Sequence, residues 1–119
     1  MCKPIDPSQL PIQLPPEAPL SAYQKYIHAL ETQHGWLDVD LVHNCFLMGE
    51  EVGELFKAIR KHQKYFTEKH TPSQDSKTAV AEELVDVFNY LLALANRLDI
   101  DMEDAFRSKN ARNQQRQWD

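Results

Sequence analysis

The chain has 119 residues, with 13 lysines and arginines against 18 aspartates and glutamates, which gives a formal net charge of −5. This acidic balance excludes a protein that neutralises the phosphate backbone of a nucleic acid polymer over a broad surface. Two cysteines are too few for a disulfide framework, and no window approaches the roughly 18 apolar residues that a membrane span needs. We therefore expect a cytoplasmic protein that binds neither nucleic acid polymers nor membranes.

Proline is concentrated at the start of the sequence, where six of the seven prolines fall within the first 19 residues. Proline lacks a backbone donor and fixes φ, which favours an extended chain over a helix. We predict a proline-rich extended arm over residues 1–20 and a helical domain over residues 21–119. Ser21 is a residue type that caps helices, and Gly35 is one that ends them, so the first helix lies between these two residues.

Two longer helices follow, and each has an apolar stripe at heptad spacing. The second helix begins after a cap at Asp38 or Asp40. Its stripe comprises Leu41, Cys45, Met48, Val52, Leu55 and Ile59. The stripe of the third helix comprises Val80, Leu84, Val87, Leu91, Leu94 and Leu98. Residues 62–76 between them are polar, which predicts a disordered or substrate-covering loop.

A fourth helix is predicted after a cap at Asp99 or Asp101, and it ends near Trp118. Glycine is scarce in the sequence, and the alternating apolar and polar runs that are typical of strands are absent. The fold class that follows is all-α, a four-helix bundle preceded by the extended arm.

Two pairs of carboxylates fall on the two long helices. Glu51 and Glu54 are three residues apart on the second helix, so they project from one side of it, about 60° apart. Glu83 and Asp86 have the same spacing on the third helix. Four carboxylates repel one another unless a hard divalent cation neutralises them, and all-oxygen ligation suits Mg²⁺, with Mn²⁺ as a substitute. Because Mg²⁺ also takes oxygens from phosphates, we expect a phosphate ester or anhydride as substrate.

Two other interpretations of the acidic residues are open. Charged residues beside an apolar stripe can form an ordinary solvated face. A di-iron carboxylate bundle would need Glu-x-x-His motifs, and the only such spacing, Glu31 to His34, lies away from both pairs. The occurrence of two pairs on two helices favours the Mg²⁺ site.

The order of these residues resembles the EExxE…ExxD signature of MazG-type nucleotide pyrophosphohydrolases. The similarity extends from Met48 to Trp118 and lies in three blocks. These blocks are LMGEEVGEL at 47–55, EELVDVFNYLL at 82–92, and Lys109 with Asn113 and Arg116. EExxE alone is a weak signal, whereas the three blocks in this order form a specific one.

The resemblance implies an all-α enzyme that hydrolyses the α–β anhydride of (deoxy)nucleoside triphosphates with Mg²⁺. The products are a monophosphate and pyrophosphate, and the role is nucleotide-pool house-cleaning. By position, the implied metal ligands are Glu51, Glu54, Glu83 and Asp86. Glu50 and Glu54 are the implied candidates for orienting or deprotonating the attacking water, and the sequence does not choose between them. The family likeness also implies a homodimer or homotetramer, which the apolar stripes favour independently.

Five residues are candidates for binding the substrate: Lys109, Asn113, Arg116, Tyr90 and Trp36. The first three are spaced i, i+4, i+7, so they share one helix face, which we expect to point inward toward phosphates or sugar. Tyr90 matches an aromatic residue that packs beside the nucleotide in similar enzymes. Trp36 supplies either a stacking wall for the base or core packing.

The base pocket is the place where the sequence departs from its relatives. Similar dCTP-type enzymes have an aromatic residue about two turns after the second-helix carboxylates, where this chain has Lys61 and His62. Base specificity therefore stays open. A related all-α hydrolase acting on phosphoribosyl-ATP or dUTP is one alternative, and a non-catalytic helical dimerisation or adaptor protein is another.

Overall fold

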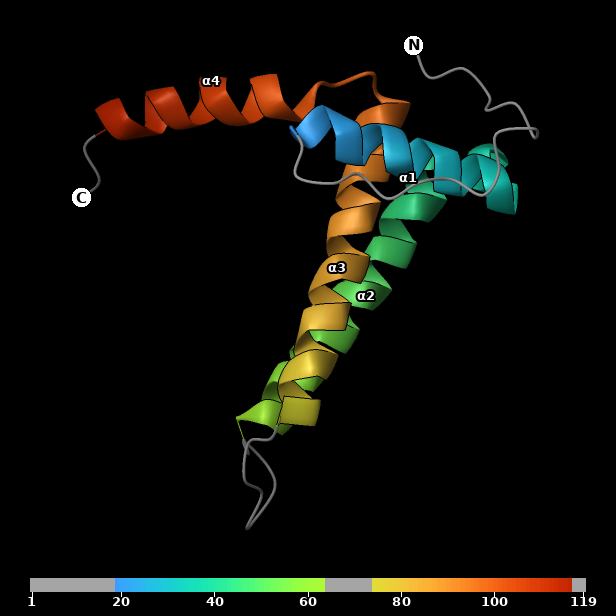
Figure 1. The fold of residues 1–119 in the computed structure, drawn as a ribbon, viewed down its shortest axis with the longest axis vertical. Coiled ribbons are helices and arrows are strands. Elements are labelled where there is room, and N and C mark those ends of the chain that lie inside the picture. Colours follow the sequence, from blue (N-terminus) through green and yellow to red (C-terminus); the bar gives the residue numbers. More distant parts are fainter. Residues whose placement is uncertain (1–18, 64–73, 117–119) are drawn as a thin grey trace. The chain divides into compact units, whose positions relative to one another are not determined.

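The computed structural model describes residues 19–63 and 74–116. Within these residues the chain forms four α-helices, one short 3₁₀ helix and no strand (Figure 1). They are α1 (Leu20–His34), η2 (Trp36–Asp38), α2 (Leu41–His62), α3 (Gln74–Arg97) and α4 (Met102–Gln115). The predicted all-α class with four helices is confirmed. No described helix combines the length and the hydropathy that crossing a bilayer demands.

Two predicted features lie outside the described residues. They are nearly all of the arm over 1–20 and most of the loop over 62–76. The division into an arm and a helical domain therefore stays a prediction. The fourth helix ends at Gln115, where Arg116 turns to an extended backbone, and so before the predicted end near Trp118. At the edges of the loop, His62 Nδ1 lies 2.7 Å from the Ser76 hydroxyl, so a hydrogen bond links the end of α2 to the start of α3.

The helix ends follow the capping chemistry of the sequence with one exception. Asp40 caps α2 by accepting from the backbone N–H groups of the second and third residues after it, and Asp101 caps α4 in the same way. Gly35 ends α1 with a φ of 73°, in the left-handed region that glycine adopts without strain. The predicted cap at Ser21 is wrong, because α1 begins earlier, at Leu20. Pro19 takes the capping position there without a side-chain bond.

The described residues divide into two compact units, and each is described by itself. The first unit contains 19–38 and 92–116, and the second contains 39–63 and 74–91. In the first unit, Ile27, Leu92 and Ala93 form a buried cluster. The partly buried residues that pack against it are Leu20, Tyr23, Tyr26, Leu30 and Met102. The apolar side of α1 thus packs into the core of this unit.

A buried glutamine joins three segments of the first unit. Gln24 of α1 donates from Nε2 to Asn96 Oδ1 at 3.1 Å and to the Ile100 carbonyl at 2.8 Å. Its Oε1 accepts from the Met102 backbone N–H at 2.9 Å, and Asn96 Nδ2 donates to the Gln24 carbonyl at 2.9 Å. The Gln24 amide therefore satisfies backbone hydrogen-bonding groups, a carbonyl and an N–H, between the end of α3 and the start of α4.

The second unit contains α2 and most of α3, which lie side by side (Figure 1). In the predicted stripe of α2, Met48, Val52 and Leu55 are partly buried. The predicted stripe of α3 is partly wrong, because Leu84 and Leu91 are 52% and 42% exposed. Val80 and Val87 of the predicted stripe are partly buried, as are Glu83, Asn89 and Tyr90, which the stripe did not include. The covered face of α3 therefore includes a carboxylate.

We predict that Gln24→Leu lowers the free energy of unfolding by about 2 kcal/mol or more. The leucine keeps the volume but leaves the buried partners of the amide without hydrogen bonds. Urea denaturation followed by circular dichroism measures the loss. The matched control is Gln33→Leu, at an exposed position of the same helix, which should leave stability nearly unchanged. Equal stability of the two variants would contradict the role given to Gln24.

Candidate metal centre

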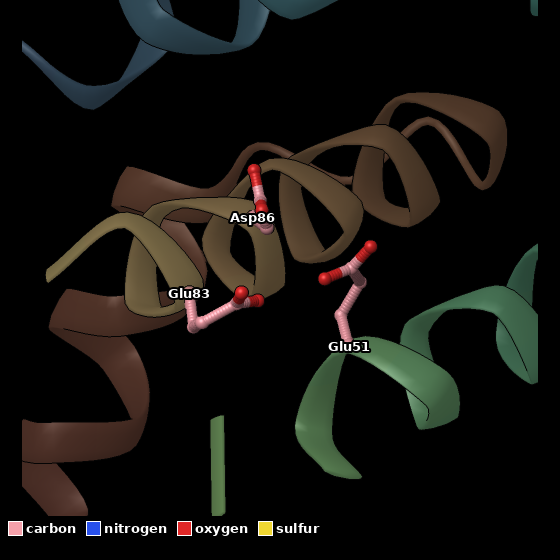
Figure 2. A group of neighbouring side chains, drawn as sticks. All are labelled: Glu51, Glu83 and Asp86. Atoms are coloured by element: carbon pink, nitrogen blue, oxygen red, sulfur yellow. The ribbon is translucent and has the colours of Figure 1, made fainter. Parts of the chain in front are cut away.

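Three carboxylates meet in the second unit, where α2 faces α3. Glu51 comes from α2, and Glu83 and Asp86 come from α3 (Figure 2). One carboxylate oxygen of each residue lies within 4.8 Å of those of the other two. The i, i+3 spacing on α3 places Glu83 and Asp86 on the same side of the helix, as the helical repeat requires. The structure thus brings together three of the four residues predicted as metal ligands.

The electrostatics of this group show what the close approach costs. Burial raises the pKa of Glu51, and a hydrogen bond with Glu83 raises it further. The negative charges of Asp86, Glu83 and Glu54 act in the same direction. Glu83 Oε2 is buried and has no hydrogen-bond partner among the described residues. An all-oxygen donor set with an unsatisfied buried oxygen fits a hard divalent cation, which would replace the shared proton and satisfy that oxygen.

Glu54 and Glu50 lie outside the group of three. Glu54 is exposed, but its charge reaches Glu51, and it lines a cavity of about 200 Å³ beside the carboxylates. The lining residues of this cavity are Glu54, Lys57, Ala58, Lys61, Ser76, Ala79 and Glu83. Sequence reasoning missed Lys57 and Ser76. A signal for Lys57 was available, since it follows Glu54 by three residues and therefore shares its helix face.

The residues predicted to bind the substrate divide between the two units. Tyr90 belongs to the second unit, is partly buried, and lies one turn after Asp86 on α3. Trp36 belongs to the first unit and is 49% exposed, so it is not a core residue. Its ring stacks on His34 with centroids 4.5 Å apart, and its carbonyl accepts from Arg97 Nη2 at 2.8 Å.

The predicted inward face of α4 differs from the structure. Lys109 and Arg116 are exposed, and only Asn113 is partly buried. Asn113 Nδ2 lies 3.4 Å from Asn110 Oδ1, and its own Oδ1 is buried without a hydrogen-bond partner among the described residues. Lys109 and Asn113 lie one turn apart on α4, whereas Arg116 follows the helix with an extended backbone (φ −79°, ψ 142°), so the predicted face shared by all three does not form. The spacing also does not show what covers Lys109 and Asn113.

Comparison with known proteins agrees with this arrangement of helices and carboxylates. The model of the MazG nucleotide pyrophosphohydrolase domain matches residues 44–118, which is more than half of the chain and includes all the carboxylates above. No curated protein and no solved structure matches the chain. The fold and the match define a hydrolase of phosphoric anhydrides. The chain belongs to the MazG nucleotide pyrophosphohydrolase family, whose members generally depend on a divalent metal.

We predict that Mg²⁺ raises the melting temperature of the protein and that this rise shrinks as the pH falls. The pKa of Glu51 is raised in the folded state, so its charge costs stability at neutral pH without a cation. That cost disappears as the pH falls through the raised pKa. The same proton competes with the cation, which binds only the ionised carboxylates. Differential scanning fluorimetry with and without Mg²⁺ across the acidic range measures both effects.

The matched variants for this experiment are Glu51→Gln and Glu82→Gln. Glu51→Gln removes the repelled charge, so the metal-free protein should melt no lower than the wild type while the Mg²⁺ response is lost. Glu82 is exposed on α3 and outside the group of three, so its variant should respond as the wild type does. An unchanged Mg²⁺ response in Glu51→Gln would show that the cation binds elsewhere.

Proposed function

We propose that the protein is a Mg²⁺-dependent pyrophosphohydrolase that cleaves the α–β anhydride of (deoxy)nucleoside triphosphates. The products are a nucleoside monophosphate and pyrophosphate, and the proposed role is nucleotide-pool house-cleaning in the cytoplasm. The observation that carries the proposal is the group formed by Glu51, Glu83 and Asp86 within the segment that matches the MazG domain. Its raised Glu51 pKa and its unsatisfied Glu83 oxygen support a bound cation.

In this proposal Glu51, Glu83 and Asp86 hold the ion, and Glu54 completes the set. Mn²⁺ is a substitute with the same preference for oxygen ligands. When bound, the ion supplies positive charge beside the phosphates and lowers the pKa of a coordinated water. Glu54 and Glu50 are the candidates for taking the proton of the attacking water. Glu54 is the stronger candidate, because its charge acts on Glu51 and it lines the adjoining cavity.

We further propose that Lys109, Asn113 and Arg116 bind phosphates or sugar, and that Tyr90 packs beside the nucleotide. Lys109 is an exposed cation on α4, Arg116 is an exposed cation just after the end of this helix, and the Asn113 amide oxygen has no hydrogen-bond partner among the described residues. Trp36 offers an accessible ring face for a base. Phosphoribosyl-ATP and dUTP are the alternative substrates, because none of these contacts specifies a base.

We also propose that the protein is a homodimer or homotetramer. The second unit exposes large apolar side chains on both of its helices, a pattern that soluble monomers rarely show over a large area. On α2 they include Val42, Phe46 and Phe56, and on α3 they include Leu84, Val85, Phe88 and Leu91. The heptad spacing of Val42, Phe46 and Phe56 suits packing against another helix, and a second copy offers the same apolar face in a two-fold arrangement. The adaptor alternative would use this surface without any metal.

We predict that the wild type releases pyrophosphate from nucleoside triphosphates only with Mg²⁺ or Mn²⁺. Glu54→Gln and Asp86→Asn should lower kcat/KM by roughly 100-fold or more, the scale of losing one preorganised electrostatic group. A coupled pyrophosphate assay on ribo- and deoxynucleoside triphosphates measures the rates, with Glu82→Gln as the control that keeps wild-type activity. Should no triphosphate, phosphoribosyl-ATP included, yield pyrophosphate, the adaptor interpretation would replace this proposal.

We predict that Phe46→Asp shifts the protein toward monomers, because it places a charge in the apolar contact between two copies. Phe46 is 70% exposed in the single chain, so the monomer itself should tolerate the change. Sedimentation equilibrium measures the mass, and His43→Asp, an exposed position on the same helix, is the control that should stay associated. A monomeric wild type at micromolar concentration would refute the proposed assembly.

A further inference from the structure

The cavity beside the carboxylates has two chemically different ends. Its α2 side presents Glu54, Lys57 and Lys61 at positions i, i+3 and i+7, and its α3 side presents Glu83 and Ser76. Along α2 the lining changes from carboxylate to lysine over two turns, about 10 Å. Among the described residues, none that lines the cavity is aromatic, and the remaining two are alanines. The described lining is therefore suited to charged groups.

The two lysines lie on one face of α2 and line the same cavity. Like charges at i, i+4 on one helix repel each other, and the charge of Glu54, three residues before Lys57, offsets this only on the side of Lys57. Neither lysine forms an ion pair with a carboxylate of the residues that the structure describes. The helix dipole explains a cation at Lys61, in the last turn of α2, but Lys57 lies one turn earlier, where the effect of the dipole has fallen off. A bound anion would account for both.

Resting on the function proposed above, we propose that this cavity holds the pyrophosphate part of the substrate, with Lys57 and Lys61 binding its β- and γ-phosphates. In the reaction the water oxygen bonds to the α-phosphorus, the bond from that phosphorus to the bridging oxygen breaks, and pyrophosphate leaves with the electron pair. The lysines stabilise the charge that develops on the leaving group. Ser76, whose hydroxyl is hydrogen-bonded to His62 Nδ1, also lines this cavity. When this hydroxyl accepts from His62, its proton can be donated to a phosphate oxygen.

This assignment narrows the class of substrate. Lys57 and Lys61 contact the β- and γ-phosphates in this proposal. The enzyme should therefore prefer triphosphates over diphosphates, which lack the γ-phosphate and fill only part of the cavity. It should also discriminate weakly among bases at this position, because the described lining offers charged and hydroxyl groups that suit phosphates. Selectivity for one base would then have to come from residues outside this cavity.

The test is the binding of inorganic pyrophosphate in the presence of Mg²⁺, followed by isothermal titration calorimetry. We expect Lys57→Gln and Lys61→Gln each to weaken binding about tenfold, the scale of one charge-assisted hydrogen bond. Binding of a nucleoside monophosphate should stay at the wild-type level. Lys77→Gln, an exposed position of α3 outside the cavity, is the matched control, and Lys61→Arg should recover most of the affinity. Melting curves without ligand show that each variant folds.

The outcomes separate this proposal from the function on which it rests. Lysine-dependent pyrophosphate binding in a protein that cleaves no triphosphate would support the cavity assignment and refute the catalytic proposal. Triphosphate cleavage with unchanged pyrophosphate affinity in both lysine variants would overturn the cavity assignment alone. A changed ranking of bases in the variants, with pyrophosphate affinity retained, would show that the cavity receives the base and would also overturn it. Absence of pyrophosphate binding to the wild type would do the same.

Discussion

Mutual repulsion among Glu51, Glu83 and Asp86 is the constraint around which the second unit is arranged. The helices hold three carboxylate oxygens within 4.8 Å of one another, although burial and repulsion make this unfavourable for ionised groups. Without a cation, a hydrogen bond between Glu51 and Glu83 offsets part of this repulsion. Burial, this hydrogen bond and the neighbouring negative charges together raise the pKa of Glu51. Packing of α2 and α3 therefore keeps together groups that would separate in a flexible chain. A cation turns this local cost into binding free energy.

The first unit handles a buried carboxylate in the opposite way. Glu31 is 6% exposed, and burial raises its pKa, but Arg97 Nη2 lies 3.5 Å from its Oε2 and counteracts that rise. This carboxylate has a cation partner, although its Oε1 is buried without a hydrogen-bond partner among the described residues, as Glu83 Oε2 is. Arg97 offsets part of the cost of burying Glu31, which gives this pair a structural role. The difference between the units is that Glu31 has an arginine beside it, whereas Glu51, Glu83 and Asp86 lie beside one another.

Local geometry was predictable from the sequence, whereas the surroundings of each helix were not. The i, i+3 pairs, the Asp40 and Asp101 caps and the Gly35 helix end depend only on spacing and residue type, and the structure has all of them. The exposure of Leu84 and of Lys109 was not predicted. Periodicity shows which residues share a face but not which face another helix covers. α2 has two sets of apolar residues, the partly buried Met48, Val52 and Leu55 and the exposed Val42, Phe46 and Phe56. Tertiary or quaternary contacts decide which set another helix covers.

The acidic character of the whole chain makes the distribution of its cations informative. A protein with a net charge of −5 repels a polyphosphate at long range, so binding one requires concentrated positive charge at the site. The structure offers two sources side by side: a carboxylate group suited to a divalent ion, and Lys57 and Lys61 at the other end of the adjoining cavity. A linear polyphosphate carries negative charge along its whole length. The ion site and the two lysines would place positive charge at both ends of the cavity, along the α2–α3 pair. In the proposed site, the lysines favour a substrate that carries β- and γ-phosphates over a ligand that contacts only the metal ion.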